Sequence, residues 1–181
     1  MSASPIEVVG YWLQHLLDPD VVNSVVALDA TYVSLNTDDP ELNKIMPWAG
    51  TSHGPQAFLD NLGGMFTRWE NQAFNVTTMF ASDENVAVFG DFRYRSRSLD
   101  KVVSSPFSIL ARVVDGKATY LQFQEDSYAA AASFRRAGSW TVQTEAAAAR
   151  HSRWDRCARS SPAHEKAHQR VPPGSCWTAA G

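Results

Sequence analysis

The sequence has almost no cysteine and no long apolar run. Its two cysteines, Cys157 and Cys176, stand near the end of the 181 residues, which is not the disulfide framework of a small secreted domain. No stretch of about 18 apolar residues is present, which argues against a membrane-spanning helix. The first residues, MSASPIEVVGYW, lack the basic start and apolar core of a signal peptide. We therefore expect a cytoplasmic protein with no membrane partner.

Motifs that hold a metal, a nucleotide or a nucleophilic serine are also missing. The chain contains no CxxC, HExxH, P-loop, GxGxxG or GxSxG pattern. His151, His164 and His168 are too scattered to predict a metal site. We expect neither a metal nor a cofactor.

Charge divides the chain into two parts. Residues 1–145 carry 10 Lys and Arg against 17 Asp and Glu, whereas residues 146–181 carry 6 against 2. An acidic body argues against nucleic acid as a partner. The second part is rich in Ala, Arg, Ser and Pro and has no apolar period, which predicts a disordered tail; the alternative is a basic arm that binds RNA or a membrane surface. We expect one domain over 1–145 and a tail over 146–181.

Two helices are predicted at the start of the domain. The first begins at Pro5, and its apolar residues recur every three or four positions through Asp18. Pro19 ends this helix, because proline interrupts helical hydrogen bonding. Asp20 then caps a second helix, whose apolar face uses residues 21–28.

Strands dominate the rest of the domain. A short strand of β-branched and aromatic residues covers 31–35, and a loop over 36–51 leads to a helix that opens at Gly54. Four strands joined by tight turns follow, at 72–81, 85–97, 102–114 and 118–127. Consecutive hairpins predict an antiparallel meander, and hence an α+β fold. A helical turn over 127–134 closes the domain.

The order and spacing of five segments carry a family resemblance. These are Leu28–Thr31, Pro47–Gly50, Phe89–Arg95, Val114–Lys117 and Phe123–Tyr128. Over residues 5–136 the chain resembles the nuclear transport factor 2-like (NTF2-like) superfamily, and more narrowly the bacterial SnoaL-like and ketosteroid-isomerase-related proteins. The resemblance implies a cone-shaped α+β barrel with a curved antiparallel sheet wrapped over the helices and an apolar pocket. It also implies a homodimer through the outer face of the sheet.

The catalytic carboxylates of these relatives are not matched in this chain. By the resemblance, the general base of ketosteroid isomerases falls on Ser34, and their oxyanion-binding acid falls near Phe107 or Ser108. The charged residues of limonene-epoxide hydrolases fall on Gly90, Phe92 and Phe123. The chain therefore lacks the charged catalytic residues on which both mechanisms depend.

Strand alternation sorts the segment 89–95 into two faces. Gly90, Phe92 and Tyr94 share one face, and Asp91 and the two arginines share the other. We expect the apolar face to point inward and the charged face to lie at the surface or in a dimer interface. The alternative is an Arg93–Asp91 pair in the pocket, which would require Phe92 and Tyr94 to face outward.

Four polar residues are candidates for chemistry in the pocket. Tyr32 and Ser34 lie on the inward side of the first strand, where they either bind a ligand oxygen or satisfy the backbone. His53 precedes the third helix at the expected pocket mouth, where the alternative is an ordinary helix-start residue. Glu125 ends the last strand, and a carboxyl buried against aromatic rings acts as an acid or base because its pKa is raised. Asp126 is expected to cap the helical turn that follows.

Aromatic side chains are expected to line the pocket or to pack in the core. The candidates for ligand binding are Tyr11, Trp12, Trp48, Phe66, Trp69, Phe92, Tyr94, Phe107 and Phe123. Two functions stay open. One is a SnoaL-like enzyme that isomerises, cyclises or hydrolyses a polyketide-, steroid- or terpenoid-like compound without a cofactor. The other is a non-catalytic module for ligand binding or dimerisation.

Overall fold

A computed structural model describes residues 3–36 and 39–138. Met1–Gly138 forms one compact unit, and the fold and the site both belong to it. The tail expected over 146–181 lies outside the described residues. No helix in the described part of the chain is long and apolar enough to cross a membrane.

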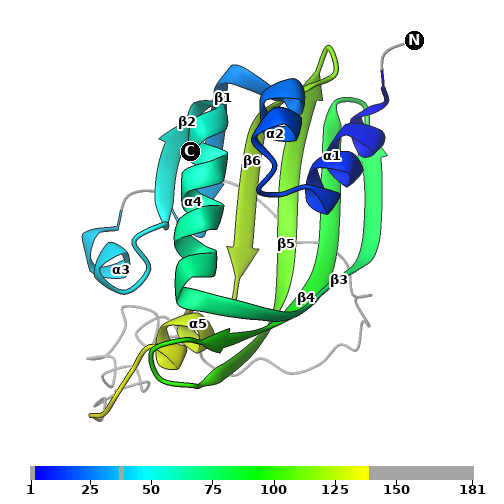
Figure 1. Ribbon diagram of the computed structural model, residues 1–181. Coiled ribbons are helices and arrows are strands. Elements are labelled where there is room, and N and C mark those ends of the chain that lie inside the picture. Colours follow the sequence, from blue (N-terminus) through cyan, green and yellow to red (C-terminus); the bar gives the residue numbers. More distant parts are fainter. Residues whose placement is uncertain (1–2, 37–38, 139–181) are drawn as a thin grey trace, which may run out of the picture. The chain divides into compact units, whose positions relative to one another are not determined.

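A six-stranded curved sheet in the order β2-β1-β6-β5-β4-β3 forms the body of this unit (Figure 1). The strands are β1 (Val26–Ser34), β2 (Gly50–His53), β3 (Trp69–Ser82), β4 (Asn85–Ser96), β5 (Val102–Val114) and β6 (Lys117–Glu125). Strands β3 to β6 make the predicted antiparallel meander. β1, however, runs parallel to β6, so the sheet is not antiparallel throughout. The predicted α+β class is confirmed, with an open rather than a closed sheet.

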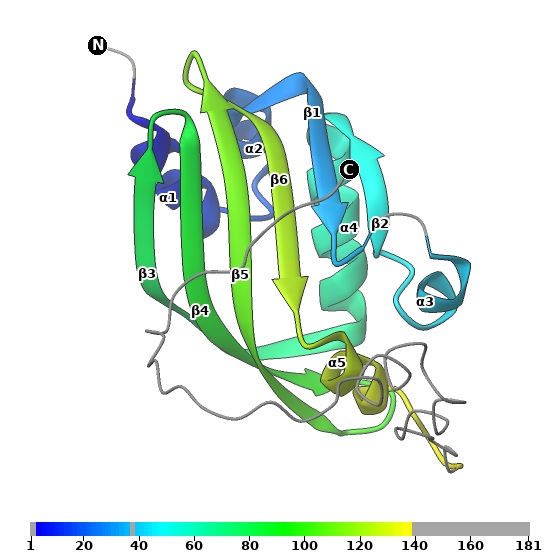
Figure 2. The ribbon, with the colours of Figure 1, turned by 180° about the vertical axis from the view of Figure 1, so that it is seen from behind.

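The helices of the described residues are α1 (Pro5–Gln14), α2 (Pro19–Val25), α3 (Pro40–Ile45), α4 (Gly54–Arg68) and α5 (Ser127–Ser133). α3 lies beside the sheet and α5 at its end (Figure 1). α1, α2 and α4 lie across the inner face (Figure 1). Seen from behind, the outer face of β3 to β6 carries no helix of the described residues (Figure 2). The sheet therefore has one buried and one exposed face.

The first two helices are shorter than predicted. α1 ends before Asp18, and Asp18 rather than Asp20 caps α2 by accepting hydrogen bonds from the backbone N–H of Asp20 (2.9 Å) and of Val21 (3.3 Å). Pro19 is the first residue of α2, where its missing N–H costs nothing. The prediction that Leu28 belongs to the apolar face of the second helix is wrong, because Leu28 lies in β1 and is 89% exposed.

Alternation along β4 is confirmed by burial. Phe92 and Tyr94 are 1% and 2% exposed on the inner face, whereas Asp91 and Arg93 are exposed on the outer face. Gly90 lies on the inner face directly opposite Phe107 of β5. The absence of a side chain at Gly90 leaves the space that the Phe107 ring occupies.

Three phenylalanines stack across the inner face above this glycine. The ring of Phe107 lies 4.4 Å from that of Phe74 and 5.7 Å from that of Phe123, measured between centroids, with interplanar angles of 16° and 20°. Offset stacking of this kind contributes beyond the burial of apolar area. The stack ties β3, β5 and β6 together on the side that faces the helices.

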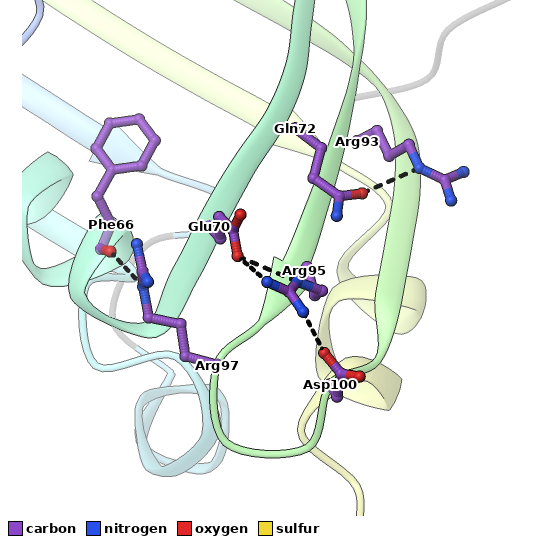
Figure 3. A network of polar contacts seen from close by, with 7 residues as sticks. All are labelled: Phe66, Glu70, Gln72, Arg93, Arg95, Arg97 and Asp100. Atoms are coloured by element: carbon purple, nitrogen blue, oxygen red, sulfur yellow. Dashed lines mark hydrogen bonds and ion pairs between the residues drawn. The ribbon is translucent and has the colours of Figure 1, made fainter.

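The charged residues of β4 form a network on the outer face (Figure 3). Arg95 pairs with Glu70 and also with Asp100, the latter at 2.6 Å, and Arg93 donates from Nε to the side-chain oxygen of Gln72 at 3.1 Å. Exposed pairs of this kind contribute little each. These contacts hold both arginines on the outer face, as the alternation predicted.

We expect Gly90→Ala to destabilise the fold by roughly 3 kcal/mol. A Cβ there would lie 2.0 Å from the carbonyl oxygen of Asn75 and 2.6 Å from the Phe107 ring, and the backbone oxygen cannot yield as a flexible side chain would. Gly63→Ala is the control, since a Cβ at Gly63 meets nothing within 4 Å and alanine is the better helix former. Urea unfolding of both variants checks the prediction, and equal stability of the two would contradict it.

Candidate functional site

A small cavity lies between the helices and the inner face of the sheet. Its free volume is about 30 Å³, room for one or two water molecules. Seven of the residues predicted for the site line it: Trp12, Tyr32, Ser34, Trp48, Phe66, Tyr94 and Phe123. The lining is mostly apolar, as the aromatic content of the sequence indicated.

Four of the predicted ligand-binding aromatics do not line this cavity. Tyr11 is 47% exposed on α1, because it lies one position away from the inner stripe that contains Trp12. Trp69, Phe92 and Phe107 are buried, but they lie behind other rings. Strand alternation gave the inward direction of Phe92 correctly, whereas the stacking of rings decides which aromatic side chain reaches the cavity.

Seven lining residues were not predicted for the site: Leu13, Leu16, Asn61, Leu62, Met65, Phe74 and Ile109. Asn61 is the polar one among them, and its Nδ2 donates to Oγ of Ser52 at 2.7 Å. A signal for Asn61 was present in the sequence. It lies three positions after Phe58 and four before Met65, which places all three on one helical face.

His53 lies apart from the cavity. It is the N-cap of α4, is exposed, and stands opposite Thr31 in the pairing of β1 with β2. Its Nδ1 is 3.3 Å from Oγ1 of Thr31. Neighbouring residues of a strand point to opposite faces. Tyr32 points to the inner face, so its neighbour Thr31, which His53 contacts, points away from it. The structure thus does not bring His53 together with the other polar candidates.

Glu125 does not line this cavity and borders a second pocket instead, yet it carries the chemically unusual group of the region. The residue is half-buried, yet both oxygens of its carboxyl group are buried and have no hydrogen-bond partner among the described residues. Burial raises the pKa of this carboxyl to about 8, and the charge of Asp126 adds to the rise. The carboxyl therefore titrates near neutral pH instead of near its ordinary value of 4.5.

Two phenol groups lie within the electrostatic reach of Glu125. Tyr32 and Tyr94 both line the cavity, and the pKa of each is raised, mainly by burial and then by the charge of Glu125. A hydrogen bond with Ser34 acts on the pKa of Tyr32 in the opposite direction. Both phenols therefore stay protonated and are hydrogen-bond donors at neutral pH.

The sequence position of Glu125 explains why its side chain points inward. Phe123, two residues earlier on β6, lines the cavity, so the alternation of the strand carries Glu125 to the same face. Asp126 caps α5 by accepting from the backbone N–H of Ala129 at 2.9 Å, which confirms its predicted role. The two adjacent carboxylates are thereby given different surroundings.

The site combines an acid-base group with hydrogen-bond donors in an apolar cavity. A carboxyl that titrates near pH 8 can take up or release a proton under ordinary conditions, and the neutral phenols can stabilise a developing negative charge on an oxygen. Within residues 3–36 and 39–138, no three His, Cys, Asp or Glu side chains cluster as metal ligands. The arrangement supports proton transfer on a bound organic molecule.

Two curated fungal proteins are similar to the chain over most of its length. Patulin synthesis protein F of Aspergillus clavatus is 40% identical over 136 residues, which covers 72% of this chain and 69% of the relative. Patulin biosynthesis cluster protein F of Penicillium expansum is 39% identical over 136 residues, with 72% and 68% covered. The chain belongs to the patulin synthesis protein F family. No family model matches it, and the bacterial kinship implied by the resemblance finds no support in these fungal relatives.

Solved structures place this patulin synthesis protein F relative in the NTF2-like fold. An NTF2-like protein from Burkholderia thailandensis has a TM-score of 0.64 at 16% identity, covering 74% of this chain and 99% of that one. TerC, co-crystallised with polyporic acid, has a TM-score of 0.58 at 22% identity, covering 70% and 95%. A Mesorhizobium loti protein described as a SnoaL-like polyketide cyclase has a TM-score of 0.53 at 15% identity, covering 67% and 98%. The expected NTF2-like fold is confirmed.

The buried carboxyl makes the stability of this patulin synthesis protein F relative depend on pH. Its pKa is about 8 in the folded state and near 4.5 when unfolded, so between these values the folded state holds a proton that the unfolded state has lost. The free energy of unfolding should therefore fall as pH rises from about 4.5 to about 8. Glu125→Gln removes the titration, and at pH above about 8 it should be more stable than the wild type by up to roughly 5 kcal/mol.

Urea unfolding at several pH values across this range measures the effect. The matched control is Glu41→Gln, whose carboxylate is exposed and paired with Lys44 at 2.6 Å, and which should keep the wild-type pH dependence. An unchanged slope in Glu125→Gln would show that the carboxyl does not titrate as the structure implies.

Proposed function

We propose that this protein is an enzyme that moves a proton on a small oxygenated compound, as an isomerase or a cyclase does, with Glu125 as the acid-base group. The observation that carries the proposal is the Glu125 carboxyl, buried without a hydrogen-bond partner and with a pKa raised to about 8. Perturbed carboxyls of this kind occur preferentially at catalytic sites, because a group with a pKa near the working pH transfers protons efficiently.

The size of the cavity supports a small substrate. A free volume of about 30 Å³ lies well below the roughly 300 Å³ or more of typical ligand pockets, so a steroid would need a much larger opening than a compound with a single ring. From the names of the relatives, we propose that this chain acts in the synthesis of patulin or of a similar small compound. Of the compound classes expected from the sequence, a small polyketide-like molecule fits best.

The proposed step uses Tyr32 and Ser34, which line the cavity, and Glu125, which does not line it but acts electrostatically on Tyr32. Ionised Glu125 takes a proton from a carbon beside a carbonyl group, and the electron pair of the broken C–H bond moves toward the carbonyl oxygen. Tyr32 donates a hydrogen bond to that oxygen as it becomes negative, and Ser34 orients the phenol. Protonated Glu125 then returns the proton to another atom of the compound, which completes an isomerisation.

Hydrogen exchange in D₂O tests this step without knowledge of the natural product. The full chain is incubated with small cyclic enones and diketones, and proton NMR follows the loss of signal at carbons beside the carbonyl. We expect Glu125→Gln to slow the exchange by roughly 10²–10⁴-fold. The kcat/KM of the wild type should rise with pH to a plateau above about 8, where Glu125 is ionised.

Glu125→Asp and Glu70→Gln are the comparison variants for this assay. Glu125→Asp keeps the acid-base group at a shifted position and should retain part of the exchange rate. Glu70 lies on the outer face (Figure 3), so Glu70→Gln should leave the exchange rate unchanged. Binding of these compounds with no exchange in the wild type would favour the non-catalytic ligand-binding module instead.

A homodimer through the outer face of the sheet is the second part of the proposal. Phe80, Phe89 and Leu110 are 53%, 45% and 45% exposed. Phe80 stands opposite Ala87, which stands opposite Leu110, and the rings of Phe80 and Phe89 lie 6.1 Å apart. Large side chains gathered on a face without a covering helix are typical of a protein interface.

Light scattering after size exclusion tests the dimer. We expect Leu110→Glu to shift the full chain from dimer to monomer, because a charge buried in an apolar interface has no partner. Leu17→Glu is the control, since Leu17 is 47% exposed at a site away from the sheet. A wild-type protein that is monomeric at micromolar concentrations would contradict the proposal.

A further inference from the structure

The indole N–H of Trp12 is a second buried polar group without a partner beside the cavity. Trp12 is 5% exposed and lines the cavity, and its Nε1 has no hydrogen-bond acceptor among the described residues. An indole N–H is a donor only, so neither a tautomer nor a flipped side chain can remove the need for an acceptor. Leaving such a donor unpaired reduces stability.

A buried indole donor away from the cavity is satisfied. Trp69 donates from Nε1 to Oγ of Ser133 at 3.1 Å, and that hydroxyl donates in turn to the carbonyl oxygen of Ala130 at 2.7 Å. Trp69 does not line the cavity, whereas Trp12 does. Among the described residues the fold thus provides an acceptor for the indole of Trp69 and none for the indole of Trp12.

Phe58 of α4 contacts both Trp12 and Tyr32. Its ring makes an edge contact with Trp12 at 5.9 Å between centroids and another with Tyr32 at 4.9 Å. Phe58 itself is fully buried and does not line the cavity, whereas Trp12 and Tyr32 both do. One fixed ring therefore supports both side chains, and a molecule in the cavity can contact each of them with different atoms.

We propose that Trp12 determines specificity by donating a hydrogen bond from Nε1 to a second oxygen of the substrate, apart from the oxygen that reacts near Tyr32. The substrate class is then a small ring with oxygen acceptors at two positions, such as a diketone, a quinone or a lactone with a further carbonyl. This inference deepens the proposed function, on which it rests for the reacting end. The binding test, however, does not require turnover.

A buried donor discriminates strongly between ligands with and without an acceptor. A ligand that offers carbon where the donor needs oxygen leaves the N–H unpaired in the complex as well, and it loses affinity for that reason. Trp12 would thus act as a positioning group that selects the substrate and sets its orientation toward Glu125, without taking part in the proton transfer.

A pair of matched probes isolates this oxygen. The first is the cyclohexanedione with ketones at opposite carbons, and the second is its analogue in which one ketone oxygen is replaced by CH₂. Both keep a carbonyl for the Tyr32 end and nearly the same shape. Binding is followed by NMR at the Ile109 methyl groups, since Ile109 lines the cavity, in the full chain and in Trp12→Phe.

We expect Trp12→Phe to reduce the preference for the diketone over its methylene analogue by about tenfold, mainly through weaker diketone binding. In the wild type, the Trp12 indole N–H signal should move on addition of the diketone and much less with the analogue. Trp69→Phe is the control for the loss of a buried indole donor away from the cavity, and it should keep the wild-type preference. Thermal unfolding of each variant verifies that it is folded.

The outcomes separate this inference from the proposed function. An unchanged preference in a folded Trp12→Phe overturns the role of Trp12, while dependence of the D₂O exchange on Glu125 would still support the enzyme. If neither probe perturbs Ile109 in the wild type at millimolar concentrations, the cavity does not bind such rings, and the inference and the proposed substrate class are both overturned. A tenfold loss of preference without any D₂O exchange supports the Trp12 contact in a non-catalytic binding protein.

Discussion

Burial of one carboxyl group without a partner is the constraint on which the site depends. A carboxylate in an apolar interior loses its hydration, and none of the described residues offers Glu125 a hydrogen bond in return. Two features hold the group there. Strand β6 continues its alternation up to this residue, and Asp126 ends the strand by capping α5. The backbone therefore cannot turn Glu125 outward without breaking the cap or the alternation of the strand.

Two of the three side chains with buried unsatisfied polar atoms in the described part of the chain lie in the cavity wall or act on it, which argues for a role beyond packing. Trp12 lines the cavity and Glu125 acts electrostatically on its Tyr32, whereas Asn43 lies on α3. Most buried polar groups in folded proteins have a hydrogen-bond partner, yet the Glu125 carboxyl and the Trp12 indole both lack one among the described residues. Active sites commonly retain such unfavourable groups because function needs them. A ligand that supplies a donor or an exchangeable proton at one end and an acceptor at the other would relieve both.

Local patterns in the sequence were enough to predict most of the fold. The alternation of β3 to β6, the Asp-Gly turn and the proline-opened helices are properties of neighbouring residues, and the positive φ of 50° at Asp115 and 76° at Gly116 fits the expected turn. The parallel pairing of β1 with β6 and the existence of β2 depend on contacts between segments far apart in the chain. Glu125 was found from its place at a strand end, whereas the contribution of Asn61 required the α4 face to be followed residue by residue.

The narrowness of the cavity links ligand binding to the chemistry. The oxygens of Glu125 are buried and Glu125 does not line the cavity, whose free volume is only about 30 Å³. A ring-sized molecule in the cavity must therefore displace side chains before it can reach them. That displacement draws on the binding energy of the ligand. A compound that fits poorly cannot supply this energy, and it leaves the acid-base group sealed. Close packing around Glu125 therefore both raises its pKa and restricts which molecules it can react with.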